Sequence, residues 1–428
     1  MRRSVLLSAI LLFAFAEPQP SATNTVANTH GLVAFWDFVQ TDGDSWTSYF
    51  DPDVSERSFP VHLKRVGDTS AYSPSDWPYL DDDSELVFDD SGPFGHAVRF
   101  NQGFIYGAVE RKEFDRTLLD LHGRRPWTII AWCKFIGERH MVAGIWDEGG
   151  WDAYAGRRQV ALFAGLFNQK GVIAHVSATG AASYPQSAIP GAQYARLRAI
   201  DRRAFDNDQW IAMAATFDPE RGEVVAYLNG AMTQHVLSDP VTEDVYRHES
   251  EQAANPFRFD YPIYSPRAFV VKFNGYDVDT SSVNEHRLYI ELNAGDVTYD
   301  RDERTVTSTT AYRVFVDVLR DGESILASPL EMKGVHGHKA ALPPGKTVRE
   351  GDEISATLQA RESDAWVQVG TNVRATVREG APFTLGRALG LGSDELGHGS
   401  QLFIDGVAVF NRVLSRDELE QLSFGSER

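Results

Sequence analysis

The stretch Asp208–Gly230, DQWIAMAATFDPERGEVVAYLNG, decides the fold. Apolar and small residues fill Trp210–Phe217, as in a strand that is buried on both faces. Asp218–Gly222 has the residue types of a tight turn, and Val224–Leu228 is typical of the returning strand. Asn229-Gly230 is a strong hairpin signal and leads into a third strand. The stretch therefore predicts a β-meander, the unit from which antiparallel sandwiches are built.

Three other stretches are typical of strands in the same kind of sandwich as this meander. Gly31–Phe38 (GLVAFWDF) and Trp127–Trp132 (WTIIAW) are typical of an opening strand and a central strand, and Gln401–Leu419 (QLFIDGVAVFNRVLSRDEL) of a closing strand and short helix. Together with the meander, they resemble the laminin-G-like domains of the concanavalin A-like lectin/glucanase superfamily. One residue departs from that pattern, because Gly406 stands where the family usually has Glu. The resemblance implies a jelly-roll sandwich, a fold that hosts lectins, hydrolases, lyases and adhesion modules.

Two short helices are expected. In the closing stretch, Ser415 and Glu418 form a capping box ahead of Leu419 and Leu422, which predicts a C-terminal helix. The segment Arg111–Leu121 predicts a second, short helix.

After the meander the pattern changes. Residues 268–378 contain short strands separated by turn residues at the spacing of an all-β sandwich. Within them, Lys346–Leu358 resembles a strand of an immunoglobulin-like or fibronectin-like domain. We therefore predict an all-β protein: a concanavalin A-like jelly-roll sandwich in residues 31–267 and 379–428, with an inserted smaller immunoglobulin-like β-sandwich in residues 268–378. The alternative is one elaborated domain.

The N-terminal segment predicts export. Met1–Ala16 has a basic start, an apolar run that is too short to span a bilayer and a small-residue cleavage site near Ala16, as in a signal peptide. A membrane anchor is the alternative. Residues 17–30 are polar and predict a disordered linker. We expect a secreted or periplasmic protein without membrane insertion.

Composition limits the partners. The chain has 60 acidic and 41 basic residues and a net charge of −19, which disfavours nucleic acid and anionic membranes. The single cysteine, Cys133, allows no disulfide within the chain and is typical of a buried hydrophobic residue.

Aromatic and charged residues gather in two predicted loops and the strand between them. Aromatic faces stack on the C–H surface of a pyranose, while carboxylates and guanidinium groups bind its polar groups. These residue types predict a groove that binds a polysaccharide or glycan, lined by Trp146, Asp147, Trp151, Tyr154, Arg158, His175 and Tyr184. The alternative is an ordinary hairpin loop whose tryptophans cap the core. A His175 buried beneath the sheet would argue against the groove.

Two other classes of function stay open. A polysaccharide lyase would use the same groove, with an Arg to neutralise a uronate and His175 or Tyr184 as the catalytic base. A glycoside hydrolase is less favoured, because the paired carboxylates that the family's glucanases carry along one strand are absent from the sequence. A structural or adhesion module would instead bind a protein partner through the insert.

The resemblance also implies a cofactor, since similar domains often hold one structural calcium ion. Asp37 and Asp405, on the opening and closing strands, match the positions best. Each is equally suited to be a hydrogen-bonded edge residue. Cysteine and histidine spacing typical of zinc sites is absent from the sequence.

Overall fold

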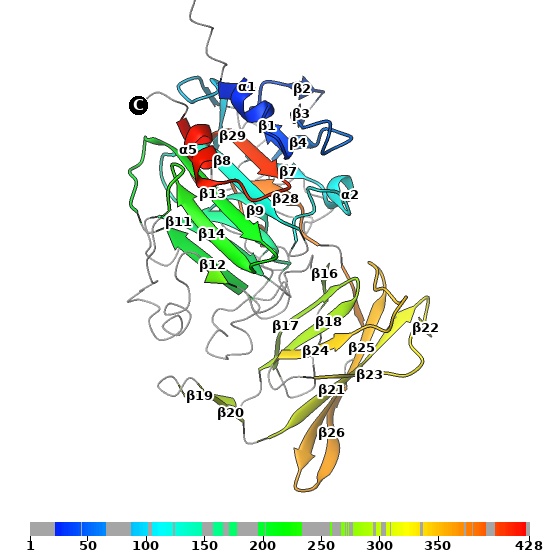
Figure 1. The fold of residues 1–428 in the computed structure, drawn as a ribbon. Helices are drawn as coiled ribbons and strands as arrows, with labels where there is room; N and C mark the ends of the chain where they lie inside the picture. The colour runs from blue at the N-terminus through cyan, green and yellow to red at the C-terminus, as the bar shows by residue number, and fades with distance from the viewer. Residues whose placement is uncertain are drawn as a thin grey trace, which may run out of the picture.

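The fold is an all-β sandwich with a further set of sheets inserted in its sequence (Figure 1). The structure is a computed structural model. The structure describes residues 22–43, 45–65, 87–101, 105–122, 125–147, 157–165, 171–177, 196–201, 203–232, 257–258, 267–269, 271, 273, 277–293, 297–300, 305–308, 310–333, 337–371, 374–378, 380–390 and 399–424.

The first layer, sheet A, is antiparallel and contains the first two strands of the predicted meander. Its order is β15-β14-β13-β8-β29-β6-β5, and β1 also pairs with β29. The strands are β1 (Leu32–Trp36), β5 (Phe88–Asp89), β6 (Ala97–Phe100), β8 (Trp127–Phe135), β13 (Trp210–Asp218), β14 (Glu223–Leu228), β15 (Phe257–Arg258) and β29 (Leu402–Phe410).

The second layer, sheet B, has the order β12-β11-β10-β9-β28-β7-β4-β3-β2. The strands are β2 (Thr41–Asp42), β3 (Ser45–Thr47), β4 (Pro60–Arg65), β7 (Ile105–Val109), β9 (Met141–Ile145), β10 (Val160–Ala164), β11 (Val172–Ser177), β12 (Arg196–Asp201) and β28 (Phe383–Leu385). The last two strands of the chain lie inside the sheets, because β28 pairs with β7 and β9 while β29 pairs with β6 and β8.

The first hairpin of the predicted meander, β13–β14, forms as its residues predict. The third strand, expected over Ala231–Val236, lies largely outside the described residues. Asp218 accepts hydrogen bonds from the backbone N–H groups of Glu220 and Arg221 and so closes the first turn. Asn229 and Gly230 both have positive φ, 51° and 74°, which is the geometry of a two-residue hairpin turn. Gly230 is required for a second reason: a Cβ there would lie 2.4 Å from the Cα of Glu420 in the C-terminal helix.

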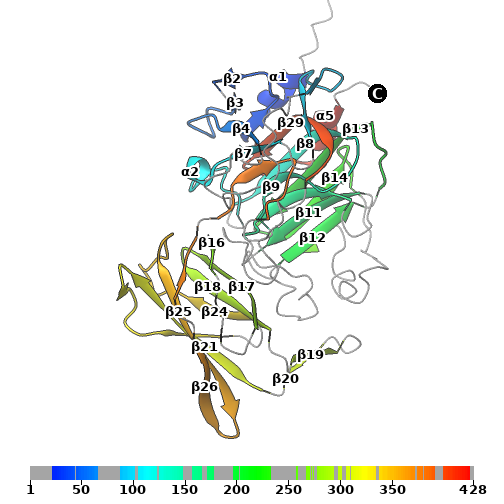
Figure 2. The same ribbon diagram turned by 180° about the vertical axis from the view of Figure 1, so that it is seen from behind.

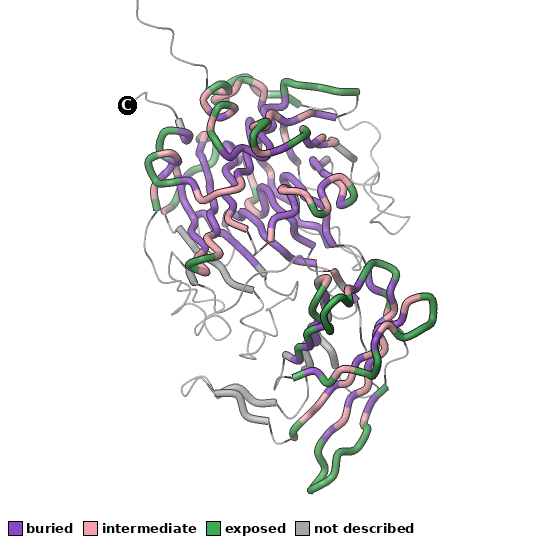
Figure 3. The backbone as a smooth tube through the Cα atoms, turned by 45° about the vertical axis from the view of Figure 1, so that its right-hand side comes forward, coloured by how far each residue is buried: buried purple, intermediate pink, exposed green. Residues whose placement is uncertain are grey.

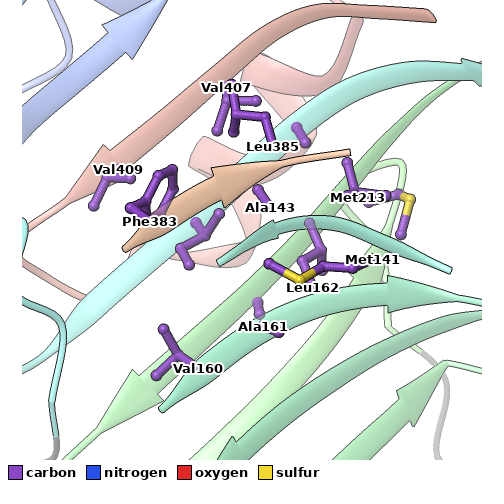
Figure 4. Close-up of a cluster of buried hydrophobic side chains, with 14 of the residues drawn as sticks. Met141, Ala143, Val160, Ala161, Leu162, Met213, Phe383, Leu385, Val407 and Val409 are labelled. Carbon is purple, nitrogen blue, oxygen red and sulfur yellow. The ribbon is translucent and has the colours of Figure 1, made fainter. Parts of the chain in front are cut away.

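The main core lies between the two sheets. Side chains that point inward from β9, β10 and β28 meet Met213, Val407 and Val409 of sheet A (Figure 4). Within sheet B, Val160 pairs with Ile145 on one side and with Val176 on the other. Since neighbouring residues of a strand point to opposite faces, the residues next to these point away from sheet A.

The far side of sheet A is covered by the two terminal helices, α1 (Ala22–Ala27) and α5 (Arg416–Phe424). The capping box predicted for α5 is present: Ser415 N–H donates to Glu418, and Glu418 N–H donates to the Ser415 hydroxyl over 3.3 Å. The predicted linker is wrong for residues 22–27, which form α1. Val26, which is 1% exposed, anchors this helix in the cluster beside α5. No helix among the described residues is long and apolar enough to span a membrane.

The other predicted helix was expected over Arg111–Leu121. In the structure, α2 covers only Arg111–Phe114. The helical path ends at Asp115, whose ψ of 129° is extended, and Arg116 follows with a left-handed φ of 64°.

Residues 267–376 form separate sheets with their own core, seen from behind in Figure 2. One sheet has the order β16-β17-β18-β24, and another the order β22-β21-β25-β26, with β23 on β21 and β27 on β25. The strands are β16 (Arg267–Ala268), β17 (Asp277–Asn284), β18 (Arg287–Asn293), β19 (Val297–Asp300), β20 (Thr305–Ser308), β21 (Tyr312–Arg320), β22 (Glu323–Ser324), β23 (Leu330–Met332), β24 (Gly337–Ala341), β25 (Glu353–Glu362), β26 (Ala365–Thr371) and β27 (Ala375–Thr376).

Candidate functional site

Four of the seven residues predicted to bind a sugar come together on sheet B. Trp146 and Asp147 directly follow β9, Arg158 lies just before β10, and His175 is in β11. Backbone hydrogen bonds hold the segments next to each other: Arg157 N–H donates to Asp147, and Gln159 N–H donates to Ile145. The other three predicted residues, Trp151, Tyr154 and Tyr184, lie outside the described residues.

Trp146 and His175 occupy the outer face of sheet B, away from sheet A. Ile145 and Val176 point into the core, so Trp146 and His175, which are next to them, point outward. Ala161 in β10 pairs with His175 and has the same orientation. His175 therefore points away from sheet A, but it is only 2% exposed. Its burial argues against the open groove that the sequence predicts.

The outer face carries a compact ring cluster, which we call the Trp146 cluster: Trp146, Phe163, His175 and His140. The imidazole of His175 stacks on the indole of Trp146, with centroids 4.8 Å apart and planes 20° apart. Phe163 meets Trp146 and His175 edge-on, with centroids 5.5 Å away in each case. His140 packs edge-on against Phe163 at 5.1 Å. The sequence did not identify Phe163, although alternation from His175 across β10 places it on this face.

Charged groups surround the cluster. The guanidinium carbon of Arg158 lies 5.9 Å from the centre of the Trp146 ring. Asp147 accepts hydrogen bonds from Arg157, whose Nε is 2.7 Å from its carboxylate oxygen. Asp147 was predicted to bind substrate, but its carboxylate is engaged by a neighbour, and this ion pair is buried. Such a pair holds Asp147 and Arg157 together, because removing either partner leaves a buried charge.

A second polar network lies next to the ion pair of Asp147 and Arg157 in the chain and includes Arg111 of α2. Arg111 lies 3.4 Å from the side-chain oxygen of Gln159 and 3.1 Å from the carboxylate of Asp120. Gln159 in turn donates to Asp120 over 3.4 Å. All three side chains are buried. Sequence reasoning missed them because their partners come from segments that are distant in the chain.

The cluster is closed to solvent, which differs from the open groove that the sequence predicts. Trp146, Asp147 and Arg158 are fully buried and His175 is 2% exposed. One donor is nevertheless not used within the described part of the chain: Nε1 of Trp146 has no hydrogen-bond partner there. A buried N–H group without a partner is costly, so this position suits a water molecule or a ligand hydroxyl.

The two residues predicted to bind calcium lie near each other at the edge of β1 and β29. Both are buried. Asp405 accepts hydrogen bonds from three consecutive backbone N–H groups, those of Phe94, Gly95 and His96. Burial raises the pKa of Asp405, these hydrogen bonds oppose the rise, and the nearby charge of Asp37 adds to it. Asp37 itself accepts from the backbone N–H of Val39 over 3.1 Å.

This donor set suits a carboxylate held by the backbone better than a calcium ligand, because N–H groups take most of the acceptor sites of Asp405. No group of three or more His, Cys, Asp or Glu that could hold a metal occurs in the described ranges. The calcium ion stays a prediction.

Comparisons with known proteins give distant similarities only. No protein-family model and no curated protein matches the chain. Among solved structures, a Trypanosoma rangeli sialidase bound to 2,3-difluorosialic acid is 11% identical with a TM-score of 0.35, over 95% of this chain and 38% of that one. The CBM40 of a Ruminococcus gnavus sialidase, bound to sialyllactose, is 11% identical with a TM-score of 0.31, over 76% and 96%.

Domain 4 of a GH43 extracellular arabinanase from Geobacillus stearothermophilus, in complex with arabinotriose, is 10% identical with a TM-score of 0.33, over 92% of this chain and 98% of that one. All three are carbohydrate-binding or carbohydrate-active proteins. The chain spans only 38% of the sialidase. At these TM-scores the likeness assigns neither a family nor a ligand, and the concanavalin A-like family stays a prediction.

Proposed function

We propose that the chain is an exported carbohydrate-binding protein that recognises an extracellular polysaccharide through the outer face of sheet B. The observation that carries this proposal is the stack of His175 on Trp146, with Phe163 and Arg158 beside it. Export rests on the signal-peptide pattern of Met1–Ala16.

The chemistry of this cluster matches that of a sugar. A pyranose has apolar C–H faces and a rim of hydroxyl groups, so it needs flat aromatic surfaces together with directional donors. Trp146 offers both, because its ring is held by His175 and its Nε1 has no partner in the described part of the chain. Arg158 supplies a guanidinium group at the edge of the ring.

Because the cluster is closed, binding requires a rearrangement that uncovers it. Side chains that are 0–2% exposed cannot contact a polysaccharide in the arrangement described. A ligand would select a more open state and would bind with an affinity reduced by the rarity of that state. We therefore expect association to be slower than for a preformed groove.

A panel of immobilised polysaccharides, acidic and neutral, tests the proposal. We expect the folded protein to be retained on at least one of them and to release no unsaturated uronate, measured by ultraviolet absorbance. Rising absorbance that His175→Ala abolishes would identify a lyase instead. Retention on none of the panel would contradict carbohydrate recognition and favour the adhesion module.

A further inference from the structure

The hairpin β25–β26 presents an exposed aromatic residue at the end of the insert. Trp366 is 36% exposed and lies near the tip of this hairpin, which extends away from the sandwich (Figures 1 and 2). Figure 3 shows the tip as one of the exposed parts of the described chain. The strand β26 is the last strand of its sheet, so one long edge of it has no partner strand in the described chain.

Pairing across the sheet defines what surrounds this tryptophan. Trp366 pairs with Arg361 of β25, and two residues further on Gln368 pairs with Gln359, which in turn pairs with Arg313 of β21. These five residues share one face of the sheet, because alternation along β25 places Leu358 and Ala360 on the opposite, buried face. Val367, between Trp366 and Gln368, points to that opposite side but is exposed. We call the five residues the Trp366 face.

The tryptophan is held in a fixed position. The guanidinium carbon of Arg313 lies 4.0 Å from the centre of the Trp366 ring, and Nε of Arg313 donates to Gln359 over 2.9 Å. Arg313 reaches across β25 to cover one side of the indole. The exposed area of the ring is therefore its other side and its edge, next to the free edge of β26.

The two arginines of this face differ in their partners. Arg313 is held by Gln359 and by two aromatic rings, those of Trp366 and Phe315. Arg361 lies 3.9 Å from the carboxylate of Asp364. The guanidinium of Arg313 keeps its positive charge but is held against the ring and Gln359. The open side of Trp366 therefore suits a ligand that offers an apolar surface to the ring and hydroxyl groups to the polar side chains.

The apolar area is too small for a protein partner. Only Trp366 and Val367 are exposed large hydrophobic residues among those described in 267–376, and they point to opposite faces of the hairpin. A stable protein interface buries about 800 Å² on each partner around an apolar centre. One fixed aromatic ring in a polar row is instead the size of a single sugar subsite.

We infer that the Trp366 face is a second carbohydrate site, which takes a neutral polysaccharide chain by stacking a sugar ring on the open side of Trp366. Gln368 lies along the same strand and would contact the next sugar. This inference extends the proposed function to the insert but stands on other residues. Two sites in one chain would raise the overall affinity for a long polysaccharide through effective concentration.

Affinity electrophoresis of the full chain tests this site, in gels that each contain a neutral β-glucan, arabinan, galactan or mannan. We expect one of these to retard the protein, and Trp366→Ala to weaken the binding about tenfold, the size of a well-packed aromatic contact. Val367→Ala is the matched control: it truncates a similarly exposed side chain on the opposite face of the same hairpin and should leave the retardation unchanged.

Four results would overturn the inference. Retardation by none of the neutral polysaccharides would do so, as would equal retardation of Trp366→Ala and the wild type. Self-association that both hairpin variants abolish would show that the tip binds another copy. Retardation lost in Trp146→Phe but kept in Trp366→Ala would support the site on sheet B and reject the one on the insert.

Discussion

The imidazole of His175 stacks on the indole of Trp146 across an intervening strand. Trp146 follows β9 and His175 belongs to β11, so β10 runs between them, yet the ring centroids are only 4.8 Å apart. The contact is possible because the outward residue of β10 that pairs with His175 is Ala161. A small residue in the middle strand therefore lets the two rings meet above it.

This relationship predicts the effect of a larger residue at position 161. Ala161→Leu would place a branched side chain beneath the rings and separate Trp146 from His175. We expect it to lower the free energy of unfolding by about 1–3 kcal/mol, as for overpacking in a closed interior. Denaturant unfolding measures this loss, and near-ultraviolet circular dichroism reports the environment of Trp146. A variant as stable as the wild type, with an unchanged aromatic spectrum, would show that the space above Ala161 is not filled by the stack.

Gly406 stands where the family that the sequence resembles usually has Glu. The packing around Gly406 gives a structural reason for this difference, which can be tested. A Cβ on Gly406 would lie 2.6 Å from the ring of Phe94, which packs edge-on against Trp132. We expect Gly406→Ala to cost about 1–3 kcal/mol in denaturant unfolding. The same substitution should cost less in a Phe94→Ala background, where the ring is gone. Equal costs in the two backgrounds would mean that Phe94 is not what excludes a side chain.

The fold followed from sequence where signals were local. The β13–β14 hairpin, the capping box of Ser415 and Glu418, and the turn at Asn229-Gly230 each depend on a few neighbouring residues, and each is present. The prediction of a linker was wrong for residues 22–27, because it relied on their polar composition. The helix α1 forms there because Val26 is buried against a cluster that includes the C-terminal helix. Such support comes from the other end of the chain and is not visible in a window of sequence.

For the candidate site, the sequence could predict which face His175 occupies but not whether that face is open. Alternation along β11 is a local property, and it places His175 outward. Burial depends on what covers the outer face of the sheet, and alternation along one strand does not indicate this. The pairing of Asp147 with Arg157 was missed for a similar reason, since a loop sequence does not reveal which of its charges are satisfied internally.

The ion pair between Arg412 and Glu418 of the C-terminal helix predicts that the stability of the protein depends on pH. Hydrogen bonds from Arg412 lower the pKa of Glu418 to about 2 despite partial burial, and Ser415 adds to this effect. Because the pKa is lowered in the folded state, the stabilisation is present above the ordinary value of 4.5 and is lost as the pH falls towards about 2. The pair is partly exposed to solvent, so we expect no more than about 1 kcal/mol.

Glu418→Gln should therefore differ from the wild type in unfolding free energy at pH 6, and the difference should shrink between pH 4.5 and pH 2. Glu420→Gln removes a more exposed carboxylate from the same helix and is the control. A difference that stays constant across this range would show that the ion pair with Arg412 is not the source of the effect.

Calcium binding at Asp37 and Asp405 has a direct test. The backbone N–H groups of residues 94–96 already occupy Asp405, so we expect neither calcium nor a chelator to shift the thermal midpoint of unfolding. A rise with calcium that is absent in Asp37→Asn and Asp405→Asn would establish the ion site that the sequence predicts. The two variants should themselves be compared without calcium, because Asp405→Asn also alters the contact with the turn at Gly95.

The measurement that tests the central claim most directly compares two buried tryptophans. Trp146 and Trp127 are both buried, and neither Nε1 has a hydrogen-bond partner in the described part of the chain, but Trp146 lies on the outer face of sheet B and Trp127 in the core. Each is changed to Phe, which removes the N–H group and keeps an aromatic ring. Calorimetric titration then uses whichever polysaccharide retains the wild type.

We expect Trp146→Phe to bind about fivefold more weakly, the loss of one hydrogen bond, and Trp127→Phe to bind as the wild type does. Equal affinities for all three proteins, or equal weakening in both variants, would contradict a sugar site at the Trp146 cluster.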